Sequence, residues 1–350
     1  MTRKEVPQPN PQTEKYLPLL LLLFAGSGCS ALIYEIVWYQ LLQLVIGSTA
    51  ISLGVLLATF MGGLFLGSML YPNFGPTKSQ HPLRVYALIE LGVGILGIVV
   101  LFGMPLLDRV YVAGVGHGLP SILLRALLAA ICLMPPTILM GASLPALSRW
   151  IEASPRGVSW MGLLYGSNTV GAVFGCLLAG FSLLRAFDMA TATYVAVAIN
   201  AAVGLIGLWL AGRSDAKPAE PAGARSPAIP AKYAWTIYAA IALSGASALG
   251  AEVVWTRLLG LLLGATVYTF SIILAVFLIG LGIGSGAGAL LSQRLNSRAA
   301  LGYCQLFLVA SIAWTAFMIA KSLPFWPVNP LLSSNPWFTF QIDLVRVLWT

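Results

Sequence analysis

Charged residues are scarce in this chain. Asp, Glu, Lys and Arg make up 9% of its 350 residues, whereas hydrophobic residues make up 59%. A soluble globular domain carries roughly 25% charged residues, which it uses to cover its surface. A chain this poor in charge has to present apolar side chains to lipid, where only helices or closed barrels satisfy the backbone hydrogen bonds. The apolar runs here are long and continuous rather than alternating, so a barrel is excluded and an all-α membrane protein is predicted.

Motifs that carry chemistry are missing as well. The sequence has no nucleophile–base arrangement, no phosphate-binding glycine loop and no cluster of metal ligands, so we predict no catalytic site, no cofactor and no metal in this chain. The net charge is +8, but the basic residues form no stripe, so a nucleic-acid partner is not expected. The cysteines lie inside apolar runs without a CxxC pair, which favours a packing role over disulfides; they are Cys29, Cys132, Cys176 and Cys304.

The apolar runs divide the chain into two membrane segments and two polar ones. Residues 1–16 are predicted to be a cytoplasmic tail, and residues 212–233, rich in Pro, Ala and charge, a solvated linker. Residues 17–211 and 234–350 would hold the spans. Leu17 to Leu70 is long enough for two of them, with a break near 40–48. The further spans are predicted at 83–103, 119–147, 158–183, 188–211, 234–257, 264–291 and 299–322.

The distribution of basic residues predicts the orientation. Most of the 19 Lys and Arg residues lie in the tail, in the linker and in the loops on the same side as these segments. By the positive-inside rule, the N-terminus and the linker are therefore cytoplasmic. A last apolar stretch opens near Phe338 and stops at Thr350, too short to cross a bilayer. We therefore expect the chain to be a fragment that ends inside a tenth helix.

The two membrane segments contain an internal repeat. Residues 27–68 align with 244–285 without a gap at an offset of 217, and 20 of the 42 positions are identical. The matches include residues that composition alone would not give, such as Glu35 with Glu252, and Tyr86 with Tyr303 keeps the same offset. Six spans separate the two copies, so both enter the membrane in the same direction. Two parallel six-helix repeats, of which the second is truncated, correspond to the layout of major facilitator transporters.

Five ionisable residues in or near the spans are candidate site residues. Glu35 and Glu252 lie at equivalent depths in their helices, and Arg125 and Arg346 enter the fourth helix of each repeat from the outer side. Buried charges need a partner or a water-filled cavity, so Glu35–Arg125 and Glu252–Arg346 are predicted to be structural ion pairs or parts of a substrate or proton site. Glu90, near the inner end of the third helix, is a lone candidate.

Several segments resemble a known family. They are SGCSALIYEIVW (27–38), LMGASLPALSR (139–149), LYGSNTVGAVFGCLLAGFSLL (164–184) and Asn200 in the sixth span. They resemble segments in the membrane half of fused major facilitator/spermidine synthase proteins of bacteria, and they occur in the same order as in that family. The resemblance implies a location in the bacterial inner membrane. It also implies an aminopropyltransferase-like domain that would follow the membrane half and carry the catalytic residues.

We therefore expect this chain to be the membrane module of such a fusion protein. It would anchor the enzyme in the lipid bilayer and transport a polyamine or another small cation, for which acidic residues in the spans are suited. The alternative is a structural anchor or assembly subunit without a transport pathway. The loop 71–78 lacks the acidic–basic pattern of major facilitator gating loops, which speaks against proton coupling.

Overall fold

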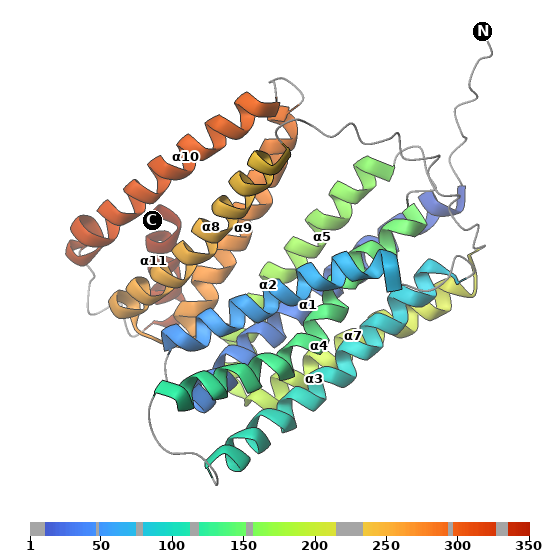
Figure 1. Ribbon diagram of the computed structural model, residues 1–350, viewed down its shortest axis with the longest axis horizontal. Coiled ribbons are helices and arrows are strands. Elements are labelled where there is room, and N and C mark those ends of the chain that lie inside the picture. Colours follow the sequence, from blue (N-terminus) through green and yellow to red (C-terminus); the bar gives the residue numbers. More distant parts are fainter. Residues whose placement is uncertain are drawn as a thin grey trace. The chain divides into compact units, whose positions relative to one another are not determined.

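Helices are the only regular secondary structure among the residues that the computed structural model describes (Figure 1). The chain divides into two compact units, 1–226 and 227–350, with the boundary inside the predicted linker. The described residues are 11–46, 49–74, 80–112, 119–151, 157–214, 234–292, 297–326 and 335–350.

The described part of the first unit contains six helical rods in chain order. The fifth rod runs without a break through a π-helical turn, η1, and ends in a short piece, α6. The elements are α1 (Pro11–Ile46), α2 (Thr49–Phe74), α3 (Pro82–Val112), α4 (Leu119–Ile151), α5 (Gly157–Leu178), η1 (Ala179–Leu183), α6 (Leu184–Ala186) and α7 (Met189–Ala211).

The described part of the second unit contains three long helices and a shorter one. The third long helix also ends in a π-helical turn, η2, followed by a 3₁₀ turn, η3. The elements are α8 (Ala234–Leu263), α9 (Val267–Ser292), α10 (Ser297–Phe317), η2 (Met318–Ser322), η3 (Leu323–Phe325) and α11 (Pro336–Trp349).

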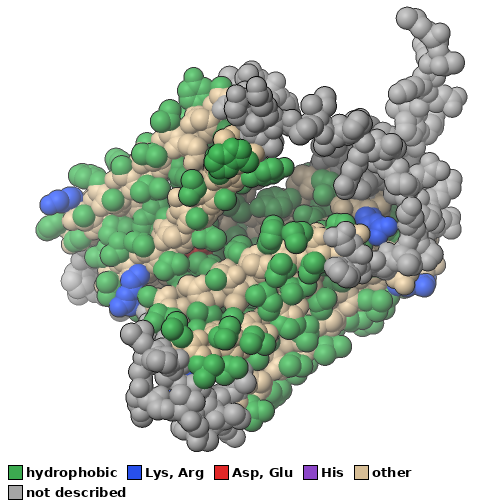
Figure 2. Space-filling model, in the orientation of Figure 1, with side chains coloured by type: hydrophobic (Ala, Val, Ile, Leu, Met, Phe, Trp, Pro, Cys, Tyr) green, Lys and Arg blue, Asp and Glu red, His purple; other side chains and the backbone are tan. Residues whose placement is uncertain are grey.

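Nine helical segments of the described residues are long and apolar enough to cross a membrane. The shortest, Val267–Gly288, has 22 residues and reaches about 33 Å, against roughly 30 Å of hydrocarbon in a bilayer. Large apolar side chains on the outside remain exposed, for example Phe65 and Phe174, each at 62%. Figure 2 shows them spread over the visible helices, with Lys and Arg near helix ends. The prediction of a multi-pass, all-helical membrane protein is thus confirmed.

Several helices extend beyond the predicted spans, for example α3, which ends at Val112 rather than near residue 103. Helix α1 begins at Pro11, inside the predicted tail 1–16, because proline is tolerated in the first turn, where its missing N–H has no partner to lose. Helix α8 continues past Arg257 to Leu263, because an arginine does not break a helix. It ends where Gly264 adopts a positive φ of 98°.

Side-chain caps define the start of two helices. The Asp188 carboxylate accepts a hydrogen bond from the Thr191 amide at 2.8 Å and so begins α7. The same hydrogen bond lowers the pKa of the exposed Asp188 side chain. Asn335 begins α11 in the same way by accepting from the Trp337 amide at 3.0 Å. The cap at Asp188 fixes the residue at which α7 starts, and α7 carries Asn200 of the site described below.

Glycines bring helices of the first unit into backbone contact. Gly171 and Gly175 of α5 lie against the backbone of Ala25 and Cys29 of α1, where any side chain would collide with it. The residue numbers of α1 and α5 rise together along this contact, so the two helices run in the same direction. Glycines at a spacing of four are the usual way for membrane helices to approach closely, since packing rather than the hydrophobic effect holds them together.

Other contacts give the directions of the remaining helices. On α2, Gly63 meets Thr137 and Gly67 meets Ile138 of α4, so these two helices are parallel. Helix α7 runs opposite to α3, because its higher residue numbers contact lower ones on α3. Gly94 of α3 faces Val197 and Asn200, whereas Gly204 faces Leu91 and Gly207 faces Ala87. The directions agree with six successive crossings that alternate in direction.

The glycine contact predicts a position-dependent effect on stability. Gly171→Ala should lower the unfolding temperature in detergent, because overpacking against the Ala25 backbone costs about 1–3 kcal/mol. Gly166→Ala on the same helix is the matched control, since its added methyl group would meet nothing within 4 Å. It should be neutral or stabilising by up to about 1 kcal/mol, the gain in helix propensity. Equal unfolding temperatures for both variants would contradict the close α1–α5 contact.

Candidate functional site

Glu90 is the centre of a polar cluster that three helices of the first unit build. Its side chain is 1% exposed. Ser27 of α1 donates its hydroxyl hydrogen to Glu90 Oε1 at 2.6 Å, and Asn200 of α7 donates from Nδ2 to Glu90 Oε2 at 2.7 Å. Each carboxylate oxygen thus has one neutral donor. No Lys or Arg of the described residues forms an ion pair with Glu90.

A constant register between α1 and α3 places Ser27 beside Glu90. Leu23 contacts Tyr86, Ser27 contacts Glu90 and Tyr34 contacts Gly97, and each pair is separated by 63 residues. Tyr86 donates its hydroxyl hydrogen to the Leu23 carbonyl oxygen at 3.4 Å. We call this line of contacts between the two parallel helices the α1–α3 seam.

Glycines allow the bulky groups of the seam to fit. A Cβ atom at Gly97 would lie 2.6 Å from Cε1 of the Tyr34 ring, so only glycine leaves room for that ring. At Gly94 a Cβ atom would lie 3.5 Å from the Cβ of Asn200, an ordinary packing distance. The absence of side chains at these two positions lets the Tyr34 ring and helix α7 approach α3 on the face that carries Glu90.

Three further polar atoms, on α1 and α7, have no hydrogen-bond partner among the described residues. They are Asn200 Oδ1, the Tyr34 hydroxyl and Trp38 Nε1, and all three are buried. The rings of Tyr34 and Trp38 stack with centroids 5.4 Å apart. Buried polar groups without a protein partner usually bind ordered water or a ligand. At Asn200 Oδ1, the cluster around Glu90 therefore has an acceptor that the described protein groups do not use.

Arg125 contacts the backbone at the end of α1. Its Nη1 donates to the carbonyl oxygen of Val45 at 2.9 Å, one residue before α1 ends. A cation at this position stabilises a helix through its free carbonyl groups and its dipole. Val45 follows Glu35 by ten residues, which corresponds to about 15 Å along the helix. This spacing disfavours a direct Glu35–Arg125 contact, which stays a prediction; Glu35 itself is 2% exposed.

Arg346 occupies the corresponding place in the second unit. It pairs with Asp343, one turn earlier on α11, with 3.5 Å between Nη1 and Oδ1. It also lines a cavity of about 410 Å³ together with Leu262, at the end of α8. Leu262 is the counterpart of Val45 in the sequence repeat. Glu252, 5% exposed, precedes Leu262 by ten residues, so its pairing with Arg346 is disfavoured for the same reason and also stays a prediction.

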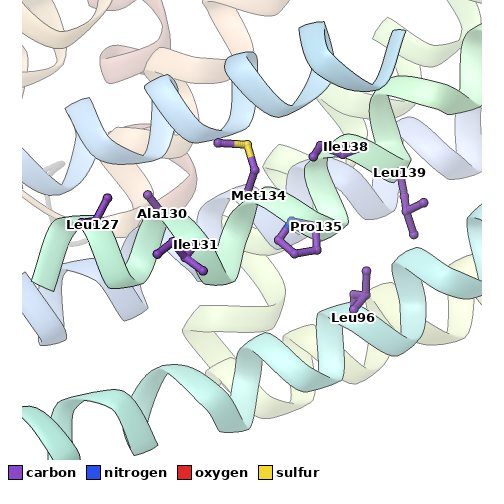
Figure 3. Close-up of a pocket in the computed structure, with 8 residues that line it drawn as sticks. All are labelled: Leu96, Leu127, Ala130, Ile131, Met134, Pro135, Ile138 and Leu139. Atoms are coloured by element: carbon purple, nitrogen blue, oxygen red, sulfur yellow. The ribbon is translucent and has the colours of Figure 1, made fainter. Parts of the chain in front are cut away.

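A different cavity, of about 600 Å³, lies between α3 and α4 (Figure 3). Leu96 of α3 faces it, and the remaining lining comes from apolar side chains of α4 such as Leu127 and Ile131. It has no ionisable lining residue, so it offers nothing to a cation or to an acid–base reaction. The candidate functional site is therefore the Glu90 cluster.

Glu90 stands out in the sequence as an acid inside a span, but its partners do not. Ser27 lies 63 residues before it and Asn200 110 residues after it, and nothing local in the sequence connects them. A signal was present, since an Asn in the middle of a span is as unusual as an acid and needs a partner in the bundle. Comparisons with protein families, curated proteins and solved structures found no match to this chain.

The Ser27–Glu90 hydrogen bond should contribute measurably to stability. Ser27→Ala removes one of the two donors to a buried carboxylate, and hydrogen bonds to charged groups contribute about 1.5–3 kcal/mol. We expect a lower unfolding temperature for Ser27→Ala in detergent. Ser68→Ala removes only an exposed bond within α2, to the Phe65 carbonyl, and should change little. If Ser27→Ala were as stable as Ser68→Ala, the Ser27 hydroxyl would not hold the carboxylate.

Proposed function

We propose that this chain is the membrane module of a spermidine synthase-like fusion protein and that it transports a polyamine or a related small cation. Its six-helix first unit and its shorter second unit would form two parallel repeats of the major facilitator layout. The N-terminus would lie in the cytoplasm and the module in the bacterial inner membrane. An aminopropyltransferase-like domain would belong to the same protein and would be anchored by this module.

Similar contacts in the two units support the two-repeat layout. In each unit, the arginine that the repeat aligns lies at the end of the first helix of its repeat, at Val45 for Arg125 and at Leu262 for Arg346. The serine of the seam also recurs. Ser244 is the counterpart of Ser27, and it accepts a hydrogen bond from Gln305 of α10 at 3.1 Å. The first and third helices are thus bonded at similar heights in both units.

The observation that carries the transport proposal is the environment of Glu90. An acidic side chain inside a membrane-spanning bundle is costly and is usually part of an ion or substrate pathway. Glu90 is balanced by neutral donors only, so its negative charge is available to a mobile cation. Asn200 Oδ1 adds a free acceptor next to it, which suits the N–H groups of an amine. Ser27 is only partly buried, which leaves an approach to the cluster from its side.

The alternative is a purely structural anchor, and the close packing of the first unit favours it. Gly171, Gly175, Gly63 and Gly67 hold their helix pairs in backbone contact. In that case the Glu90 cluster would only fix the register of three helices, as buried polar groups do in some bundles. The two functions differ in what they require of the Glu90 charge. Transport requires the negative charge of Glu90, whereas holding the three helices in register requires only its hydrogen bonds.

Uptake into proteoliposomes separates the two functions. Glu90→Gln keeps the shape and most hydrogen-bonding capacity but removes the charge. Leaving a buried cation without its partner costs about 3–5 kcal/mol, so uptake of labelled putrescine should fall by more than about 100-fold. Asp188→Asn is the control, because it removes an exposed carboxylate outside the spans and asparagine also caps helices well. Undiminished uptake by Glu90→Gln would refute the role of Glu90, and no uptake by the unmodified protein would favour the anchor.

A further inference from the structure

The cavity of about 410 Å³ in the second unit lies where two membrane spans end. It is lined by Leu262 and Leu263, at the end of the span in α8, and by Leu323, Pro324 and Trp326, at the end of the span that α10 begins. These spans have 29 and 27 residues, or about 43 and 40 Å, which is the thickness of a bilayer with its headgroups. The cavity therefore lies at the depth of the lipid headgroups.

Arg346 of α11 supplies the positive charge of this cavity. It is the only ionisable residue among the described residues that line it. Its Nε atom is buried and has no hydrogen-bond partner among the described residues. Its Nη1 atom is 3.5 Å from Asp343 Oδ1, longer than the usual charge-assisted hydrogen bond of about 2.7–2.9 Å. A guanidinium group has five donors, keeps its charge and binds phosphate through two parallel N–H groups. Arg346 thus has donors left for an anion.

The end of α8 adds negative partial charge next to the same cavity. The last four carbonyl groups of a helix have no partner within it, and the negative end of the helix dipole lies there. Leu262 and Leu263 are the last two residues of α8. The carboxylate of Asp343, beside Arg346, adds a full negative charge. These groups repel a lone phosphate, whereas they attract a ligand that also carries an ammonium group.

The first unit has a direct protein contact at the corresponding place. There Arg125 donates to the carbonyl oxygen of Val45 at 2.9 Å, near the end of α1. In the second unit, Arg346 aligns with Arg125 and Leu262 with Val45, and both line the cavity. A guanidinium donor and the end of a helix, which bond to each other in the first unit, thus border a space that a ligand can occupy in the second.

We propose that this cavity binds the headgroup of a phospholipid that carries a primary ammonium group, as in phosphatidylethanolamine. The phosphate binds to the guanidinium group of Arg346, and the ammonium group donates to carbonyl oxygens at the end of α8 and to Asp343. A choline headgroup fits less well, because its quaternary nitrogen has no N–H to donate. A glycerol headgroup has no positive charge to balance Asp343. The site is independent of the proposed transport, because no residue of the Glu90 cluster takes part in it.

Native mass spectrometry of the protein in mild detergent measures lipid binding directly. Phosphatidylethanolamine, phosphatidylcholine and phosphatidylglycerol with identical acyl chains are titrated separately. We expect phosphatidylethanolamine to bind at least about tenfold more tightly than the other two, since each of these lacks one charge-assisted interaction. Equal affinities for the three lipids would overturn the proposal, because they would show that the acyl chains alone determine binding.

Two substitutions at the same end of the bundle test the role of the guanidinium group. Arg346→Gln should weaken phosphatidylethanolamine binding at least about tenfold. Lys321→Gln is the matched control, because it removes one positive charge two residues before Leu323 from an exposed side chain that does not line the cavity. Should Arg346→Gln fail to fold, Leu263→Trp keeps the guanidinium group and fills the cavity, with the same expected loss. Binding as tight in these variants as in Lys321→Gln would refute the site.

Competition separates a lipid from a soluble ligand of the same chemistry. Free phosphoethanolamine carries the same two charged groups but has no acyl chains to hold it in the membrane. We expect an equal concentration of phosphoethanolamine to leave the lipid bound. If it displaced phosphatidylethanolamine, the cavity would be a site for a soluble zwitterion, and its assignment to a lipid would be wrong.

Discussion

In a membrane, the backbone and a buried charge need hydrogen-bond partners within the helical bundle, and this requirement shapes the described part of the chain. Helices satisfy the backbone, which is why the described residues form helices and leave their apolar side chains to the lipid. Few side chains can then be polar. Glu90 is tolerated because Ser27 and Asn200 reach it from two other helices. The polar cluster and the packing of α1, α3 and α7 therefore depend on one another.

Register is what makes this arrangement possible. A shift of one residue between α1 and α3 would rotate Ser27 away from Glu90 by about 100°. Glycines set the distances between α1 and its neighbours. Gly97 of α3 accommodates the Tyr34 ring, and Gly171 of α5 admits the backbone of α1. The second unit has the same serine, Ser244, but the bond comes from Gln305, a neutral amide. The position that aligns with Glu90 holds Phe307. The contact between α8 and α10 therefore lacks the carboxylate that Glu90 gives to the α1–α3 seam.

The sequence predicted the spans well because span length and apolarity are local properties. The predicted spans began too late in α1 and ended too early in α8, because the helices include Pro11 and continue past Arg257. Candidate residues such as Glu90 could be named because acids in spans are rare. Their partners could not, because depth in the membrane says nothing about the rotation of a helix. The hydrogen bond from Arg125 to the Val45 carbonyl could not be predicted either, because no side-chain pattern indicates a backbone atom as the partner.

The central claim is that the carboxylate of Glu90 binds a small cation. Calorimetric titration of the protein in nanodiscs with putrescine measures this binding directly. The account predicts that the unmodified protein binds putrescine and that Glu90→Gln binds it at least about 100-fold more weakly, because a buried cation without its partner costs about 3–5 kcal/mol. Equal affinities of the two proteins for putrescine would contradict it.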